Sequence, residues 1–75
     1  MGSKQEKEQF HEVPVILRRK QVEARVGLTR STIYRRIAER TFPSPVSLGL
    51  RAVGWVEAEI SDWLLSRLAK RRRAR

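Results

Sequence analysis

Arginine is the side chain most able to do chemistry in this sequence, and it is concentrated in one short stretch. Arg30, Arg35 and Arg36 all lie in the segment VEARVGLTRSTIYRRI, which covers residues 22–37, and Ser31 and Thr32 stand between them. Guanidinium and hydroxyl groups donate hydrogen bonds to phosphate oxygens and to the edges of bases. The chemistry indicated is therefore recognition of a polyanion, and it needs an element that holds these donors on one face.

The apolar residues of this segment predict two short helices joined by a tight turn. Before the glycine, Val22 and Val26 lie four residues apart, and after it Ile33 and Ile37 repeat the same spacing. Gly27 can adopt the positive φ that ends a helix, and the Thr29 hydroxyl can cap the next one. We expect helices from about 18 or 19 to 26 and from 30 to about 39. This order is typical of a helix-turn-helix, whose second helix enters the DNA major groove.

The segments around these helices predict a small β-hairpin and a third helix. Pro14 makes residues 13–17 an extended lead-in, and two prolines make residues 41–45 an extended connector. Residues 46–48 and 52–55 are β-prone pieces with Arg51 at or next to the tip between them. An apolar stripe predicts a helix from Val56 onward, and its members are Val56, Ile60, Trp63, Leu64 and Leu68.

These elements predict one mainly α domain over residues 14–69, built as a helix-turn-helix, a wing and a third helix. We expect Ile16, Leu17, Phe42 and the two tryptophans to enter its core. Residues 1–13 are predicted to be disordered, and residues 70–75, KRRRAR, are predicted to be an unfolded basic tail.

Charge and composition narrow the classes of partner. The net charge is +9, and residues 13–55 hold nine basic side chains against two acidic ones. A folded domain with this content has one strongly positive side. The sequence has no cysteine and one histidine, His11, so neither a disulfide nor a zinc cluster is expected. No apolar run approaches a membrane span or a secretion signal, and we expect a cytoplasmic bacterial protein associated with the nucleoid.

Three stretches of the chain resemble the AlpA family of short phage and prophage transcriptional regulators. They are LRRKQVEARVGLTRSTIYRRI at 17–37, FPSPVSLG at 42–49 and RAVGWVEAEISDWL at 51–64. The family is related in fold to MerR-like winged helices and to phage excisionases. The resemblance implies a DNA-binding second helix, a wing formed by the hairpin, and control of phage or prophage genes.

Helical geometry sorts the candidate DNA contacts into classes. With Ile33 and Ile37 facing the core, the opposite face of the helix presents three expected base contacts, Ser31, Thr32 and Arg35. Arg35 is the strongest, since its fork matches guanine O6 and N7. Arg51 is the expected wing contact. The expected backbone contacts are Arg18, Arg19, Arg30, Tyr34, Arg36 and Arg40. The tail residues expected to attract DNA nonspecifically are Lys70, Arg71, Arg72, Arg73 and Arg75.

Three functions remain open at this stage. The first is a sequence-specific regulator that binds double-stranded DNA, and the second is an excisionase-like factor that bends DNA through the same surface. The third is a nonspecific RNA-binding protein, which total charge and the tail favour equally. An enzyme is not expected, nor are a cofactor, a metal, a membrane or a small-molecule ligand, since no carboxylate pair, activated nucleophile or glycine-rich phosphate loop is present. Besides DNA, a second copy of the chain, RNA polymerase or an integrase is a candidate partner.

Overall fold

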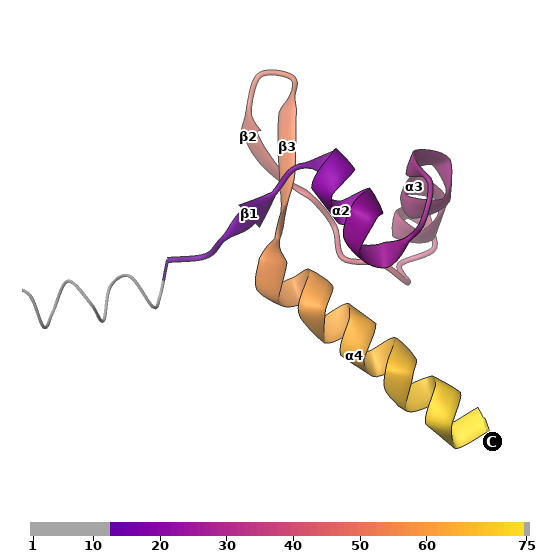
Figure 1. The fold of residues 1–75 in the computed structure, drawn as a ribbon. Helices are drawn as coiled ribbons and strands as arrows, with labels where there is room; N and C mark the ends of the chain where they lie inside the picture. The colour runs from indigo at the N-terminus through magenta and orange to yellow at the C-terminus, as the bar shows by residue number, and fades with distance from the viewer. Residues whose placement is uncertain (1–12, 75) are drawn as a thin grey trace, which may run out of the picture.

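The computed structural model describes residues 13–74, which form six elements (Figure 1). In chain order these are β1 (Ile16–Leu17), α2 (Arg19–Val26), α3 (Arg30–Ala38), β2 (Val46–Gly49), β3 (Ala52–Val56) and α4 (Glu57–Ala74). The fold class expected from the sequence is confirmed: the described part is mainly helical and carries a small antiparallel sheet. The segment expected to be disordered, residues 1–13, lies outside the described residues except for Val13.

The turn between α2 and α3 is made by local side-chain and backbone chemistry. Gly27 has a φ of 70°, and its amide donates a hydrogen bond of 2.8 Å to the carbonyl of Glu23. Thr29 caps α3, because its Oγ1 accepts the amide of Thr32 at 3.3 Å. At the start of α2, Arg18 offers no acceptor, but the Gln21 side chain accepts the Arg18 amide at 2.7 Å. Both helices and the turn are thus confirmed.

The three strands form one antiparallel sheet in the order β1-β3-β2. The hairpin of β2 and β3 is confirmed, with Val46 opposite Gly54 and Ser47 opposite Val53. The lead-in is a strand as well, because Ile16 pairs with Val56. The expectation that Val56 begins the last helix is therefore wrong: this β-branched residue ends β3, and α4 begins one residue later.

The core lies where the sheet meets the three helices of the described chain. Its buried side chains are Leu17, Val22, Ile33, Phe42, Trp55 and Ile60. The 41–45 connector is fastened to this core through both indoles. Trp55 Nε1 donates to the carbonyl of Pro43 at 3.0 Å, and Trp63 Nε1 donates to the carbonyl of Thr41 at 2.7 Å. The expected core placement is confirmed for Leu17, Phe42 and Trp55, whereas Ile16 and Trp63 are only partly buried.

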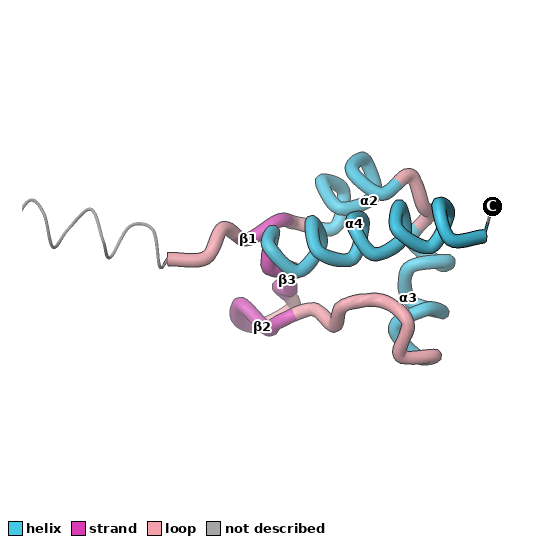
Figure 2. Tube along the Cα trace, turned by 90° about the horizontal axis from the view of Figure 1, so that it is seen from below, coloured by secondary structure: helices cyan, strands magenta, loops and turns pink. Residues whose placement is uncertain are grey.

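The last helix is longer than expected and extends past the core. In both views the strands lie toward one side, and α3 and the end of α4 lie toward the other (Figure 2). Leu68 is 50% exposed and so lies outside the core in which it was expected. The prediction of an unfolded tail is also wrong for residues 70–74, which continue α4. Arginine and alanine are good helix formers, and neither Gly nor Pro interrupts the chain after Gly54.

Candidate nucleic-acid interface

A basic hollow forms where the starts of α2 and α3 meet the hairpin. Its volume is about 440 Å³, and the residues that line it are Arg18, Arg19, Lys20, Arg30, Tyr34, Arg51 and Val53. Five of these seven side chains are cationic, and they come from three separate segments of the sequence. Such a concentration of like charge is favourable only opposite an anion, so the hollow is suited to a phosphate backbone.

The exposed face of α3 lies beside this hollow and holds the residues expected to read bases. The Arg35 side chain is 63% exposed, and its Nε lies 4.0 Å from a carboxylate oxygen of Glu39. This separation is too long for a strong hydrogen bond, so the guanidinium is free to engage a ligand. Ser31 is exposed as well. These two positions match the helical geometry expected from the sequence.

Thr32 has a second role that reduces its freedom. Its side chain is partly buried, and its Oγ1 lies 3.0 Å from Oγ1 of Thr29, while its amide is bound by the same oxygen. The N-cap of α3 therefore occupies part of the hydrogen-bonding capacity of Thr32.

Tyr34 connects the hollow to the core. Its ring packs edge-on against the buried Trp55, with centroids 6.2 Å apart and planes at 69°. The guanidinium of Arg30 lies over the Tyr34 ring, with its Cζ 5.8 Å from the ring centroid. Because Trp55 belongs to β3, these contacts of Tyr34 join α3 to the strand that forms one side of the wing.

Arg36 and Arg40, two of the expected backbone contacts, do not line the hollow. Arg36 is partly buried, and its Nε is shielded without a hydrogen-bond partner in the described structure. Arg40 follows the end of α3 with a φ of 64°, and its amide donates to the carbonyl of Ile37 at 3.0 Å. Arg30 at the start of α3 therefore lines the hollow, whereas Arg35 and Arg36 lie in the last turn of the helix and Arg40 follows it.

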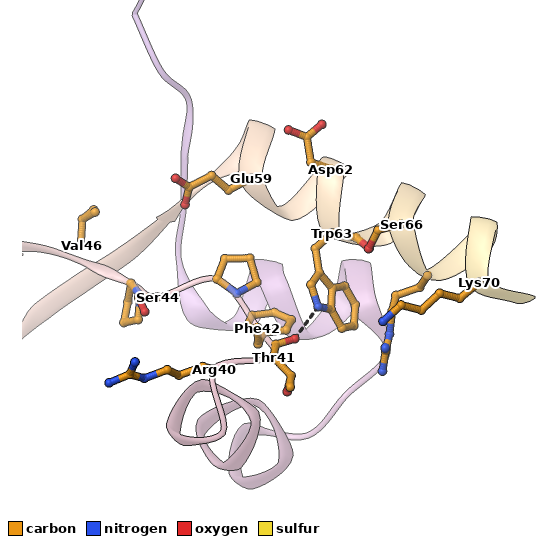
Figure 3. Close-up of a pocket in the computed structure, with 13 residues that line it drawn as sticks. Arg40, Thr41, Phe42, Ser44, Val46, Glu59, Asp62, Trp63, Ser66 and Lys70 are labelled. Atoms are coloured by element: carbon orange, nitrogen blue, oxygen red, sulfur yellow. Dashed lines mark hydrogen bonds between the residues drawn. The ribbon is translucent and has the colours of Figure 1, made fainter.

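Arg40 instead lines a larger groove between the 41–45 connector and α4 (Figure 3). This groove has a volume of about 850 Å³, and the bond from Trp63 to the Thr41 carbonyl crosses it. Its wall on α4 carries Glu59 and Asp62 as well as Lys70. The mixture of signs makes the groove less suited to a polyanion than the basic hollow.

Two basic residues of α2, Arg19 and Arg25, form ion pairs within the protein. Arg19 is bound to Glu23 on the same helix, and Nη2 of Arg25 lies 2.9 Å from a carboxylate oxygen of Glu57 on α4. Lys20, by contrast, is an exposed residue of the hollow that sequence reasoning missed. Its position beside Arg18 and Arg19 at a helix start was the signal that could have found it.

The tip of the wing is the turn Leu50–Arg51. Arg51 has a φ of 61°, in the left-handed region that non-glycine residues rarely adopt, and it faces the basic hollow. Its neighbour Leu50 is 91% exposed. The expectation that Arg51 lies at the tip is confirmed. Near the C-terminal end of α4, Lys70 and Arg71 are exposed.

Within residues 13–74, no group of three or more His, Cys, Asp or Glu side chains is placed to hold a metal ion. The helices of the same region are also too short or too polar to cross a membrane.

A helix-turn-helix, a wing and a closing helix, with positive charge gathered where the first two meet, define a domain of the winged helix-turn-helix class. The family model described as "Prophage CP4-57 regulatory protein (AlpA)" matches residues 15–68. This chain therefore belongs to the AlpA family, and the resemblance noted in the sequence is confirmed.

Two curated relatives support this assignment. "Uncharacterized protein ORF88" of Enterobacteria phage P4 is 47% identical over a match that covers 63% of this chain and 53% of that protein. The "DNA-binding transcriptional activator AlpA" of Escherichia coli (strain K12) is 41% identical, and the match covers 69% of this chain and 83% of the relative. The chain thus spans about half the length of the phage protein and most of the bacterial one.

Proposed function

We propose that this chain is a sequence-specific regulator of phage or prophage transcription that binds double-stranded DNA. The basic hollow carries the proposal, since it lies beside the N-terminal turns of a helix that exposes Ser31 and Arg35. The first turns of such a helix, which hold Ser31 here, meet base edges when the helix lies in the major groove. Arg35 in the last turn extends the same exposed face with a long side chain. The Escherichia coli relative is named a DNA-binding transcriptional activator, which supports the same function.

In this mode Arg35 reads a guanine through two parallel hydrogen bonds to O6 and N7. Ser31 contacts an adjacent base or its phosphate. Thr32 adds a weaker contact, because it also serves the N-cap of α3.

The hollow supplies the contacts that hold the duplex in register. Phosphates on one side of the groove are bound by Arg18, Lys20 and Arg30. Arg51 binds the flanking DNA and so positions the wing on it. Arg19 adds to this field in part, since Glu23 neutralises some of its charge. The other cations proposed to contact DNA reach the backbone farther along the duplex, and they are Arg36, Arg40, Lys70, Arg71, Arg72, Arg73 and Arg75.

Binding rather than catalysis is the activity proposed, and it takes place on a bacterial or phage chromosome. A single domain with few base readers specifies a short site. Useful specificity therefore calls for a second copy on the DNA or for a partner such as RNA polymerase or an integrase.

Selection of bound duplexes from a random pool tests this function. We expect enrichment of one short motif, bound about 10³-fold or more tightly than unrelated duplex at ~150 mM salt. The control is structured RNA offered as a competitor at the same salt. Failure to enrich any motif, with RNA competing as well as DNA, would refute the proposal and favour a nonspecific RNA-binding protein.

A further inference from the structure

The most exposed large apolar side chain in the described structure lies at the tip of the wing. Leu50 is 91% exposed, more than Leu65 at 62% or Leu68 at 50%. Burial of a leucine side chain is favourable, so a leucine held in water is suited to a partner that covers it. Contact of the wing tip with a partner would therefore be favourable, because it removes the Leu50 side chain from water.

The backbone of the tip breaks the ordinary rule for a hairpin turn. Tight hairpin turns favour Asn and Gly, because these residues tolerate positive φ. Here the turn residues are Leu50 and Arg51, and Arg51 adopts a φ of 61°. A strained non-glycine residue that the surrounding structure maintains is a pointer to function.

The position of the tip decides which partner it meets. Arg51 lines the basic hollow together with the starts of α2 and α3, so a duplex seated on the hollow runs past Leu50. With α3 in the major groove, the next surface that a projecting wing reaches is the phosphate backbone and the adjoining minor groove. Arginine is favoured in a narrow minor groove, and apolar side chains there enter between base pairs.

We infer that Leu50 is an apolar wedge that enters the minor groove beside the site bound by α3 and partly unstacks one base step, which bends the duplex. This inference rests on the DNA binding proposed above and adds a source of specificity. A wedge selects steps that unstack easily, and pyrimidine–purine steps such as TA and CA are the most deformable. Arg51 anchors the wedge by its charge, and Leu50 performs the deformation.

The direct test measures unstacking in the duplex that the selection returns. The probe is a set of about 40-base-pair versions of that duplex, each with 2-aminopurine at one position flanking the motif. We expect wild-type protein to raise the fluorescence at one flanking step. Leu50→Ala should abolish this rise and lower affinity about tenfold, whereas Leu50→Met should restore both, because it retains the apolar bulk.

Leu65→Ala is the matched control, since it removes the same atoms from an exposed leucine on α4. We expect it to leave the fluorescence, the affinity and the bend unchanged. End-to-end energy transfer on the same duplexes should show a bend with wild-type protein and a straighter duplex with Leu50→Ala. Circular dichroism of each variant confirms the fold, which exposure of Leu50 predicts to be intact.

The inference is overturned if wild-type protein leaves every flanking step stacked, or if Leu50→Ala unstacks and bends the duplex as wild-type protein does. In either case a motif would still have been selected, so the proposed regulator would stand without the wedge. Absence of any selected motif would instead overturn the proposed function itself.

Discussion

Replacing Arg35 by lysine tests whether this side chain reads a base. The substitution keeps the charge but removes the planar fork that binds guanine O6 and N7 together. Arg35 is 63% exposed, and its pairing with Glu39 at 4.0 Å contributes little to stability. We therefore expect an unchanged melting temperature, so any change in binding reports the contact with DNA.

The size of the effect follows from the chemistry of the contact. Loss of a bidentate arginine–guanine pair costs about 1–3 kcal/mol of discrimination, which is roughly 5- to 150-fold in affinity for the selected site. Affinity for a scrambled duplex should change little, because one positive charge replaces another. Arg30→Lys is the matched control in the same helix: as a phosphate contact it should keep nearly full affinity for both duplexes.

Fluorescence anisotropy with the selected and scrambled duplexes measures these affinities at ~150 mM salt. Equal losses on both duplexes would make Arg35 a backbone contact. No loss on either would remove it from the interface. A loss of discrimination with Arg30→Lys as large as with Arg35→Lys would refute the assignment of the outward face of α3 to base reading.

Three further substitutions or deletions probe the wing, the tail and the turn. Arg51→Ala should reduce the slope of log affinity against log salt by about 0.9, the value for one lost phosphate contact, and an unchanged slope in a salt titration would place the wing away from DNA. Deletion of residues 70–75, which hold five basic side chains, should weaken binding to every duplex and reduce the same slope by up to about 4.5. Intact affinity for scrambled DNA would show that this end of α4 touches no phosphate. Gly27→Val should lower the free energy of unfolding by about 2 kcal/mol, because a β-branched residue resists a φ of 70°. Thermal circular dichroism should then show a Tm lower by roughly 8–16 °C. Melting at the wild-type temperature would contradict this account of the turn.

Local chemistry was the part of the fold that the sequence predicted well. Gly27 and Thr29 act on their own immediate neighbours, so the end of α2 and the start of α3 could be placed from residue types. The exposure of Ser31 and Arg35 followed from helical geometry once Ile33 was assigned to the core. The tip at Arg51 followed from the β-prone pieces on each side of it.

Features that depend on distant partners were missed. A strand of two residues carries no periodicity, so the sequence did not predict that Ile16 pairs with Val56 at the edge of the sheet. The boundary at Val56 failed for the same reason, since its apolar side chain suits either element. Lys20 stands beside Arg18 and Arg19 at the start of α2, which was a local signal, but its approach to the wing is a product of the tertiary fold.

The end of α4 was misjudged because charge was weighed above helix propensity. The run from Lys70 to Arg73 repels itself, but each residue is a good helix former and continues a helix already started at Glu57. The half-exposed Leu68 belongs to the same error, because the predicted stripe assumed that the core reaches as far as the helix does.

During synthesis the helix-turn-helix leaves the ribosome before the strand that must hold it. Leu17 pairs with Trp55, and Ile16 pairs with Val56, so the lead-in strand has no partner until β3 has emerged. Such long-range pairings form late, because a large loop must close before the contact stabilises it. A nascent chain that ends before Trp55 therefore has α2 and α3 without the side chain that seats Tyr34. We expect that the ability to bind a specific site is acquired in one step, when translation has passed the wing. Shorter nascent chains should bind DNA only nonspecifically, through their positive charge.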